Sequence, residues 1–296
     1  MADMDPRKMA LQIAGLRANE THRPANERVF EDPYAERFFP DDIRAMFLDP
    51  ARVKGELAKY EQVMPGVNGA IVARIRFIDE CLAGCIAQKA KQLVIIGAGY
   101  DTRAYRIDGV KAHLKVFEVD HPATQAVKTH TIQGIFGQLP DHVAYVPVIF
   151  GRDRIDRKLM ENGCRPELKT LFIIEGLLMY IPPSAVDALL AFIAHGSGPG
   201  SSFVADYFDS SVVEGTSPLR EAQALRKFVE NEGSQLQFGI RVGEEAAFFK
   251  ARGFGQITCV SSQACKEKFF TNESRKRTVS PMFNFVHATV IGHDGA

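Results

Sequence analysis

Residues 93–106, LVIIGAGYDTRAYR, predict the fold of this chain. Four apolar residues end at Gly97-Ala98-Gly99, which is typical of a buried strand followed by a tight turn. In an open parallel sheet, ligands bind at the carboxyl end of such a strand, where glycine lets the backbone come close to them. Thr102 stands at the third glycine of a dinucleotide fingerprint, so the turn favours a nucleotide-like ligand without a pyrophosphate.

A second predicted strand, residues 115–120, ends in Asp120 about twenty residues after the turn. A carboxylate at this place can accept hydrogen bonds from both hydroxyls of a ribose. Either feature alone could equally be a turn glycine or a solvated acid. Together they predict a cofactor that carries a ribose.

Strands and helices alternate from residue 93 to residue 193, which predicts a parallel sheet with helices on both faces. Further strands are expected at 143–150, 171–174, 202–208, 255–260 and 283–291. Residues 1–65 predict an N-terminal segment of two or three short helices, and residues 209–240 predict a helical insertion after the fifth strand. Residues 66–296 then form the main domain.

The composition limits the kinds of partner. The 296 residues contain 36 Lys+Arg and 36 Asp+Glu, so a net charge of zero gives no signal for nucleic acid or for an anionic membrane. No apolar run approaches the roughly 20 residues of a membrane span, and no signal peptide is recognised. The odd number of cysteines, five, without a C-x-x-C pair favours reduced thiols in the cytoplasm and no metal site.

Three motifs together resemble the leucine carboxyl methyltransferase family. They are GAGYDTRAYR from Gly97, FEVDHP from Phe117 and FIIEGLLMYIP from Phe172. The resemblance implies a Rossmann-like class I methyltransferase fold, with a mostly parallel seven-stranded sheet whose last strand is antiparallel. It also implies S-adenosylmethionine as the cofactor, S-adenosylhomocysteine as its product and no metal. The N-terminal segment would be a lid over the cofactor.

The resemblance further implies a cofactor site. Its residues are Arg74, Gly97, Ala98, Gly99, Asp101, Asp120, Phe150 and Glu175. Arg74 would bind the carboxylate of the methionine moiety through its planar guanidinium. Glu175, at the end of the fourth strand, would contact the cofactor; its position also suits ordering water near the transferred methyl group. A helical arginine and a strand-end glutamate are otherwise more often solvated.

The predicted adenine end departs from the family pattern. Ile149 stands where the family commonly has an aspartate. Adenine would then be bound by backbone groups near Phe150, by packing on its ring, or by Asp153 reaching back.

The kind of acceptor decides whether a base is needed. A carboxylate is ionised at neutral pH and needs only an anchor, for which Arg220, Arg226 and Arg241 in or near the insertion are candidates. Tyr180, within the motif FIIEGLLMYIP, is a further candidate for contacting the substrate.

A phenol has a pKa of about 10 and benefits from deprotonation. Tyr207, Asp206 and His121 are the candidate bases. The residues do not distinguish a carboxylate acceptor from a phenol.

The activity expected is therefore S-adenosylmethionine-dependent O-methylation of a carboxylate or phenolic hydroxyl on a small molecule, such as a polyketide-type metabolite. Three alternatives remain: carboxyl methylation of a protein C-terminus, cofactor binding without catalysis, and a NAD-dependent oxidoreductase, which would share the strand, the turn and the ribose acid. The protein is expected to be cytoplasmic and a monomer or homodimer, without nucleic acid or membrane partners.

Overall fold

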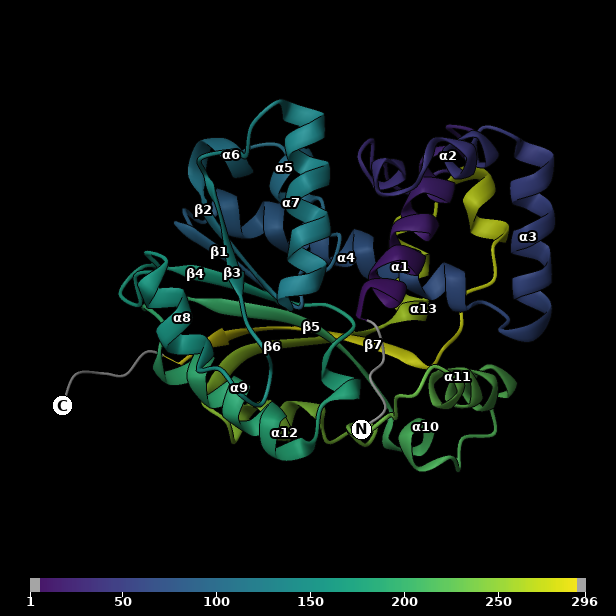
Figure 1. Ribbon diagram of the computed structural model, residues 1–296. Helices are drawn as coiled ribbons and strands as arrows, with labels where there is room; N and C mark the ends of the chain where they lie inside the picture. The colour runs from purple at the N-terminus through teal and green to yellow at the C-terminus, as the bar shows by residue number, and fades with distance from the viewer. Residues whose placement is uncertain (1–5, 292–296) are drawn as a thin grey trace.

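Seven strands form one sheet at the centre of the computed structural model, which describes residues 6–291 (Figure 1). They are β1 (Gln92–Ile96), β2 (Lys115–Asp120), β3 (Val143–Pro147), β4 (Thr170–Ile174), β5 (Ser202–Phe208), β6 (Phe254–Ser261) and β7 (Phe283–Val290). Their order is β3-β2-β1-β4-β5-β7-β6, with β1–β5 parallel and β7 antiparallel to both neighbours. The predicted class I methyltransferase fold is confirmed. The strand order reverses between β1 and β4, the place where such sheets bind ligands.

Helices cover both faces of this sheet and one of its ends. They are α1 (Pro6–Thr21), η1 (Ala35–Phe38), α2 (Asp41–Phe47), α3 (Pro50–Val63), α4 (Val67–Ala87), α5 (Arg103–Arg106), α6 (Val110–His113), α7 (Pro122–Phe136), α8 (Ile155–Glu161), η2 (Leu178–Tyr180), α9 (Pro183–His195), α10 (Ser210–Glu214), α11 (Arg220–Asn231), α12 (Glu245–Lys250), α13 (Ser262–Phe269) and η3 (Asn272–Lys276). None of the helices within residues 6–291 has both the length and the hydropathy of a membrane-spanning helix.

The sheet is buried because its central strands carry apolar side chains on both faces. In β1, Leu93 and Ile95 join the core beside α4 and α13, whereas Val94 and Ile96 join the core beside α8, α9 and α12. The two cores hold the carboxyl ends of β1, β2, β4 and β5 in fixed register, and these ends carry the predicted site.

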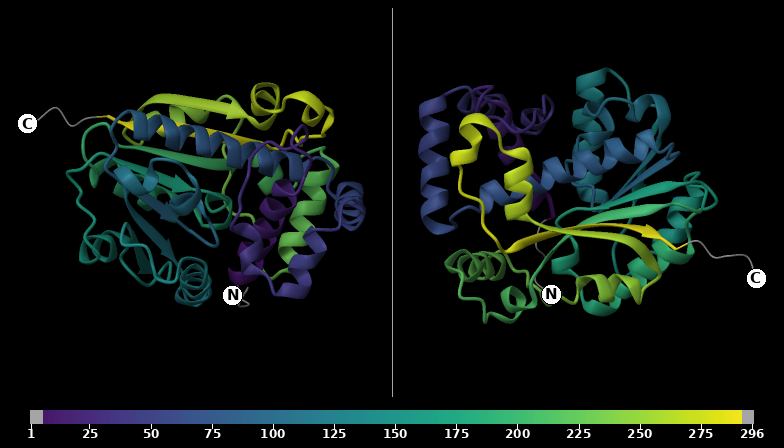
Figure 2. Two further views of the ribbon diagram at one scale, coloured as in Figure 1. Left: turned by 90° about the horizontal axis from the view of Figure 1, so that it is seen from above. Right: turned by 180° about the vertical axis from the view of Figure 1, so that it is seen from behind.

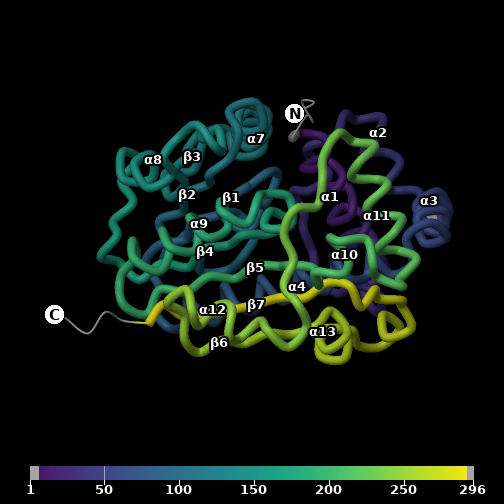
Figure 3. The backbone as a smooth tube through the Cα atoms, turned by 90° about the horizontal axis from the view of Figure 1, so that it is seen from below, coloured from purple at the N-terminus to yellow at the C-terminus, as the bar shows by residue number. Residues whose placement is uncertain are grey.

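The N-terminal helices and the insertion lie beyond that end of the sheet. Figures 2 and 3 show α1–α3 and α10–α11 gathered on this side. Lys8 of α1 forms an ion pair of 3.5 Å with Glu232, directly after α11. A backbone bridge between Asp209 and Ile240 closes the insertion at its base. The predicted ranges 1–65 and 66–296 include residues 1–5 and 292–296, which lie outside the described residues.

Two of the N-terminal helices are longer than the sequence pattern predicts. α1 has 16 residues and α3 has 14. α1 contacts α4, α7 and η1, so packing within the folded protein stabilises it. It also lies over the glycine turn, because a Cβ added to Gly99 would be 3.4 Å from the Cβ of Ala10.

Candidate functional site

The glycine turn after β1 joins that strand to the end of β2. Gly97 and Gly99 have φ angles of 71° and 46°, in the left-handed region that favours glycine. The backbone N–H groups of Gly97 and Ala98 donate to the carbonyl oxygen of Val119 at 2.9 and 3.0 Å. These bonds place the turn beside Asp120.

Asp120 lies at the turn as predicted. Its carboxylate accepts hydrogen bonds from the backbone N–H of Gly99 and, at 2.5 Å, from that of His121. Burial raises the pKa of Asp120, and these two hydrogen bonds oppose the rise. A carboxylate has about four lone-pair sites, so about two remain for further donors.

Arg74 connects α4 with the ends of β4 and β5. Its Nε donates to Oε1 of Glu175 at 3.0 Å, and its Nη1 donates to Oδ2 of Asp206 at 2.8 Å. The guanidinium is buried, with 5% of its side chain exposed. Five N–H donors are available on an arginine, so some remain for a ligand.

The two acids beside Arg74 differ in their electrostatics. Burial raises the pKa of Glu175, but Arg103 and Arg74 outweigh burial and hold it below its ordinary value. Burial raises the pKa of Asp206 in spite of Arg74. The backbone N–H of Gly176 donates to Oδ1 of Asp206 at 2.6 Å, so both carboxylate oxygens of Asp206 already accept hydrogen bonds.

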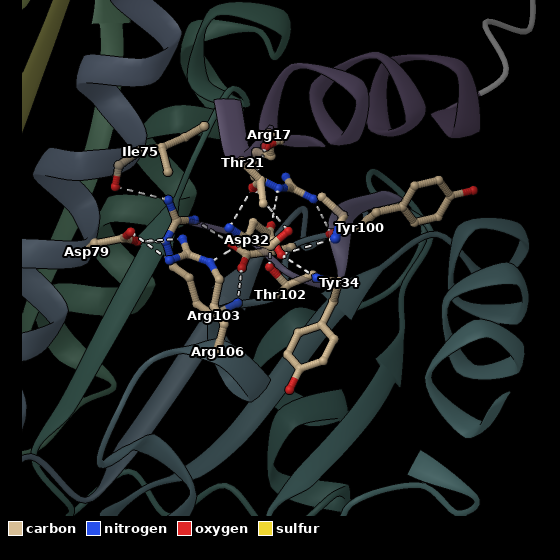
Figure 4. Close-up of polar contacts among 12 residues, drawn as sticks. Arg17, Thr21, Asp32, Tyr34, Ile75, Asp79, Tyr100, Thr102, Arg103 and Arg106 are labelled. Atoms are coloured by element: carbon tan, nitrogen blue, oxygen red, sulfur yellow. Dashed lines mark hydrogen bonds and ion pairs between the residues drawn. The ribbon is translucent and has the colours of Figure 1, made fainter. Parts of the chain in front are cut away.

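Arg103 extends the ion pairs from Glu175 back to α4. Its Nη1 donates to Oε2 of Glu175 at 2.5 Å, and its Nε donates to Oδ1 of Asp79 at 2.7 Å. Arg106 donates to the same Asp79 carboxylate at 2.8 and 2.9 Å (Figure 4). Through these ion pairs Arg103 and Arg106 hold the segment after the glycine turn against α4.

Asp32 attaches the N-terminal segment to this network. It accepts from Nε of Arg17 at 2.7 Å and from Oγ1 of Thr102 at 2.6 Å (Figure 4). The backbone N–H groups of Tyr34 and Ala35 donate to its other oxygen at 3.1 Å. A side chain from before η1 therefore fixes the loop that follows the glycine turn.

Sequence reasoning gave no role to Asp32 or Asp79. Asp32 precedes Pro33 in the N-terminal segment, and Asp79 follows Arg74 by five residues. The motifs contain many arginines and many acidic residues, and this was the one signal in the sequence for a network of four arginines and five carboxylates. The network consists of Arg17, Arg74, Arg103, Arg106, Asp32, Asp79, Asp101, Glu175 and Asp206. One extra negative charge favours a cationic ligand.

Asp101 follows β1 and Phe150 follows β3, and β2 lies between these two strands. Asp101 accepts from the backbone N–H of Arg103 at 2.6 Å and pairs with its guanidinium, as expected of a capping residue. Phe150 lies after β3 and is 38% exposed. The carboxylate of Asp153 accepts from the backbone N–H of Ile149 at 2.8 Å, so Asp153 does reach back to this segment.

The three candidate bases are not brought together. Tyr207 follows Asp206 in β5 and so points to the opposite face, where it packs against Phe249 in the core beside α12. β1 and β4 separate β2 from β5, so the backbones at His121 and Asp206 are about 14 Å apart, three strand spacings. Nδ1 of His121 accepts from the backbone N–H of Ala123 at 3.2 Å and caps α7.

The residues predicted to contact the acceptor have different surroundings. Arg220 and Arg241 are exposed, and Arg226 donates to the carbonyl oxygen of Val213 at 3.0 Å. Tyr180 lies in η2, which packs against β5, the strand that carries Asp206, and burial raises the pKa of Tyr180 to about 12. Within residues 6–291, no group of three or more His, Cys, Asp or Glu side chains is arranged to hold a metal ion.

Comparisons with known proteins agree with this geometry. Residues 10–194 match the model of the leucine carboxyl methyltransferase family. A protein of Mycolicibacterium smegmatis, named as a predicted S-adenosyl-L-methionine-dependent methyltransferase, is 33% identical over 209 residues, 69% of this chain and 67% of that protein. YktD of Bacillus subtilis, named in the same way, is 26% identical over 217 residues, 73% of this chain and 71% of that protein.

Solved structures support the fold alone, because their sequence identities are low. A methyltransferase-like protein of Thermobifida fusca aligns with a TM-score of 0.58 and 15% identity over 94% of this chain and 98% of that one. A protein of Streptomyces avermitilis aligns with a TM-score of 0.57 and 11% identity over 93% and 97%. With the family match over more than half of its length, this chain belongs to the leucine carboxyl methyltransferase family and is an S-adenosylmethionine-dependent methyltransferase.

Proposed function

We propose that this protein transfers the methyl group of S-adenosylmethionine to an oxygen atom of a small molecule. The observation that carries the proposal is the convergence of Asp120, the glycine turn, Arg74 and Glu175 at one end of the parallel sheet. This is the end where the strand order reverses and where ligands bind in such folds.

The donor and acceptor groups present fit the parts of this cofactor. Asp120 would accept the two ribose hydroxyls with its remaining lone pairs. Arg74 would donate to the carboxylate of the methionine moiety, and Glu175 or Asp101 would accept from the ammonium group. The adenine would lie near Phe150 and the backbone of Ile149, whose N–H donates to the Asp153 carboxylate.

The charge of the site suits the same ligand. S-adenosylmethionine carries a sulfonium, an ammonium and a carboxylate, so its net charge is positive, whereas the demethylated product is neutral. The five carboxylates and four arginines of the network leave one negative charge in excess. The field of these charges would favour the methylated cofactor over its product.

Little further catalytic chemistry is required of the chain. The bound cofactor supplies a methyl group on a positively charged sulfur, which is already a strong electrophile. Aligning the acceptor oxygen with that methyl group is worth effective molarities of roughly 10⁵ to 10⁸ M. The lid and the insertion would hold the acceptor in line and exclude water.

The geometry speaks against the oxidoreductase alternative. A dinucleotide needs open backbone at the glycine turn for its pyrophosphate, but α1 lies over Gly99 and Thr102 donates to Asp32 beneath the lid. The five cysteines are free thiols, which fits the cytoplasmic location that we propose.

Calorimetric titration with S-adenosylmethionine, S-adenosylhomocysteine and NADH tests the proposal. We expect micromolar binding of both adenosyl ligands and no heat with NADH. Binding of NADH, or of none of the three, would contradict it. Binding of the adenosyl ligands without methylation of any oxygen acceptor would favour the non-catalytic alternative.

A further inference from the structure

Asn68, in the first turn of α4, is a buried amide that lacks a partner. It is 6% exposed, and neither its Nδ2 nor its Oδ1 has a hydrogen-bond partner among the described residues. Buried side-chain polar atoms normally have one. An asparagine amide offers two N–H donors and one acceptor oxygen. A ligand group that both donates and accepts would satisfy it.

Two phenol hydroxyls belong to the same region. Tyr60 near the end of α3 and Tyr180 in η2 are partly buried, and in the described part of the chain neither hydroxyl makes a hydrogen bond. Tyr180 lies in η2, which packs against β5, the strand whose Asp206 accepts from Arg74 at 2.8 Å. The charges of Arg74 and Asp206 and the Tyr60 phenol also act on the pKa of Tyr180. Burial raises the pKa of Tyr60 to about 12, which keeps its hydroxyl protonated and able to donate at neutral pH.

The connection between α3 and α4 brings Tyr60 toward Asn68. Only residues 64–66 separate the two helices, and the backbone N–H of Met64 donates to the carbonyl oxygen of Tyr60 at 2.8 Å. Asn68 precedes Arg74 by six residues, about 9 Å along the helix axis. The two side chains also differ by about a third of a turn around that axis. The methyl group to be transferred must lie near the methionine moiety that Arg74 would bind, so we infer that the acceptor lies toward this end of α4.

The two tyrosines border an apolar part of the core. Tyr60 and Tyr180 pack against the same core cluster, which contains Met64 beside α4, Met179 of η2 and Leu225 of the insertion helix α11. An aromatic ring would be buried well among them.

The local charges favour a neutral ligand group over a carboxylate. The buried guanidiniums of Arg74 and Arg103 are shared among carboxylates, and Arg220 and Arg241 are exposed. Amide and phenol groups are neutral, and burying an ion without a counter-charge is costly. A neutral hydroxyl on an aromatic ring matches both the polar and the apolar parts of this region.

We propose that Asn68, Tyr60 and Tyr180 form an acceptor subsite that binds the hydroxyl-bearing ring of a phenol. The inference rests on the proposed function and adds the class of its acceptor. Asn68 and Tyr60 bind and orient the phenol. As the phenol oxygen bonds to the methyl carbon, the bond from that carbon to sulfur breaks and the hydroxyl proton passes to Asp206, the candidate base beside Arg74.

The test compares variants on matched pairs of probes. The phenols are 2-naphthol and 4-phenylphenol, and their counterparts are 2-naphthoate and 4-phenylbenzoate, which differ only in the reacting group. Formation of S-adenosylhomocysteine from S-adenosylmethionine measures turnover, and calorimetry measures cofactor affinity. We expect at least one phenol to be methylated, and its carboxylate counterpart to react at least tenfold more slowly.

Asn68→Leu, which keeps the side-chain size, should lower kcat/KM for the phenol about tenfold through the loss of its hydrogen bonds. Tyr60→Phe should lower it severalfold. Affinity for S-adenosylhomocysteine should change less than twofold in both, and the melting temperature of Asn68→Leu should not fall. Asn162→Leu, at an exposed position after α8, is the control and should change nothing.

Failure of the proposed function and failure of the acceptor subsite give different results. Loss of adenosyl-ligand binding by the wild-type protein would reject the proposed function and the subsite with it. Normal cofactor binding with no methylated phenol, a preference for the carboxylates, or an unchanged Asn68→Leu would reject the subsite alone. A melting temperature several degrees lower in Asn68→Leu would show that the amide serves folding, through a buried water for example, and would also reject it.

Discussion

Replacing Asp32 with asparagine should be far more damaging than its position near the N-terminus suggests. Asp32 is 1% exposed and accepts four hydrogen bonds, from Arg17, Thr102 and two backbone N–H groups. Asparagine keeps the shape but removes the charge. One carboxylate oxygen also becomes an NH₂ group, which would face donors instead of accepting from them.

The expected loss of folding stability follows because Arg17, the partner that remains, is buried. The side chain of Arg17 is 7% exposed, so Asp32→Asn leaves a buried guanidinium without its counter-charge. Removing one partner of a buried ion pair costs about 3–5 kcal/mol. Since native proteins are stable by only about 5–15 kcal/mol, that is a large fraction of the whole.

Urea unfolding at pH 7 measures the change, and hydrogen exchange of the α1 amides shows whether the lid opens before the rest. Asp41→Asn is the matched control, because Asp41 pairs with Arg44 at 2.5 Å but its side chain is 93% exposed. Exposed pairs contribute about 0–1 kcal/mol. If Asp32→Asn costs no more than Asp41→Asn, and α1 exchanges as in the wild type, the argument from burial is refuted.

Three further predictions concern the cofactor site and its support. Asp120→Ala should weaken calorimetric affinity for S-adenosylhomocysteine by about 1–3 kcal/mol, and unchanged affinity would reject the ribose contact. Arg74→Ala should weaken S-adenosylmethionine more than 5′-methylthioadenosine, which lacks the amino acid moiety; equal losses would reject the carboxylate contact. Burial raises the pKa of Glu118 from 4.5 to about 7, so between these values the folded protein keeps a proton that the unfolded chain has lost. The free energy of unfolding should therefore fall as pH rises through this range, and urea titrations of Glu118→Gln should lack that part of the slope, whereas an identical slope would assign the titration to another group.

Much of the fold could be predicted because its signals are local. β5 begins and ends at the predicted residues, 202 and 208, and β3 begins at the predicted residue 143. α13 was not predicted, because its eight residues carry a short, mostly polar sequence, and packing against α4 and β6 stabilises it.

The site was harder to predict because its partners are far apart in the sequence. Asp32 bonds to Thr102 across 70 positions, and Arg74 bonds to Asp206 across 132. A pattern among neighbouring residues in the sequence does not predict pairs that are so far apart along the chain. The alternation of side chains along a strand, however, already implies that Asp206 and Tyr207 point to opposite faces, so only one of them could be at the site.

A crystal structure with S-adenosylhomocysteine would test the central claim most directly, which is that the cofactor binds where β1, β2 and β4 end. We predict both ribose hydroxyls within about 3.2 Å of the Asp120 carboxylate and the cofactor carboxylate within the same range of the Arg74 guanidinium. Ligand density elsewhere, or at this place with the ribose away from Asp120, would contradict the account.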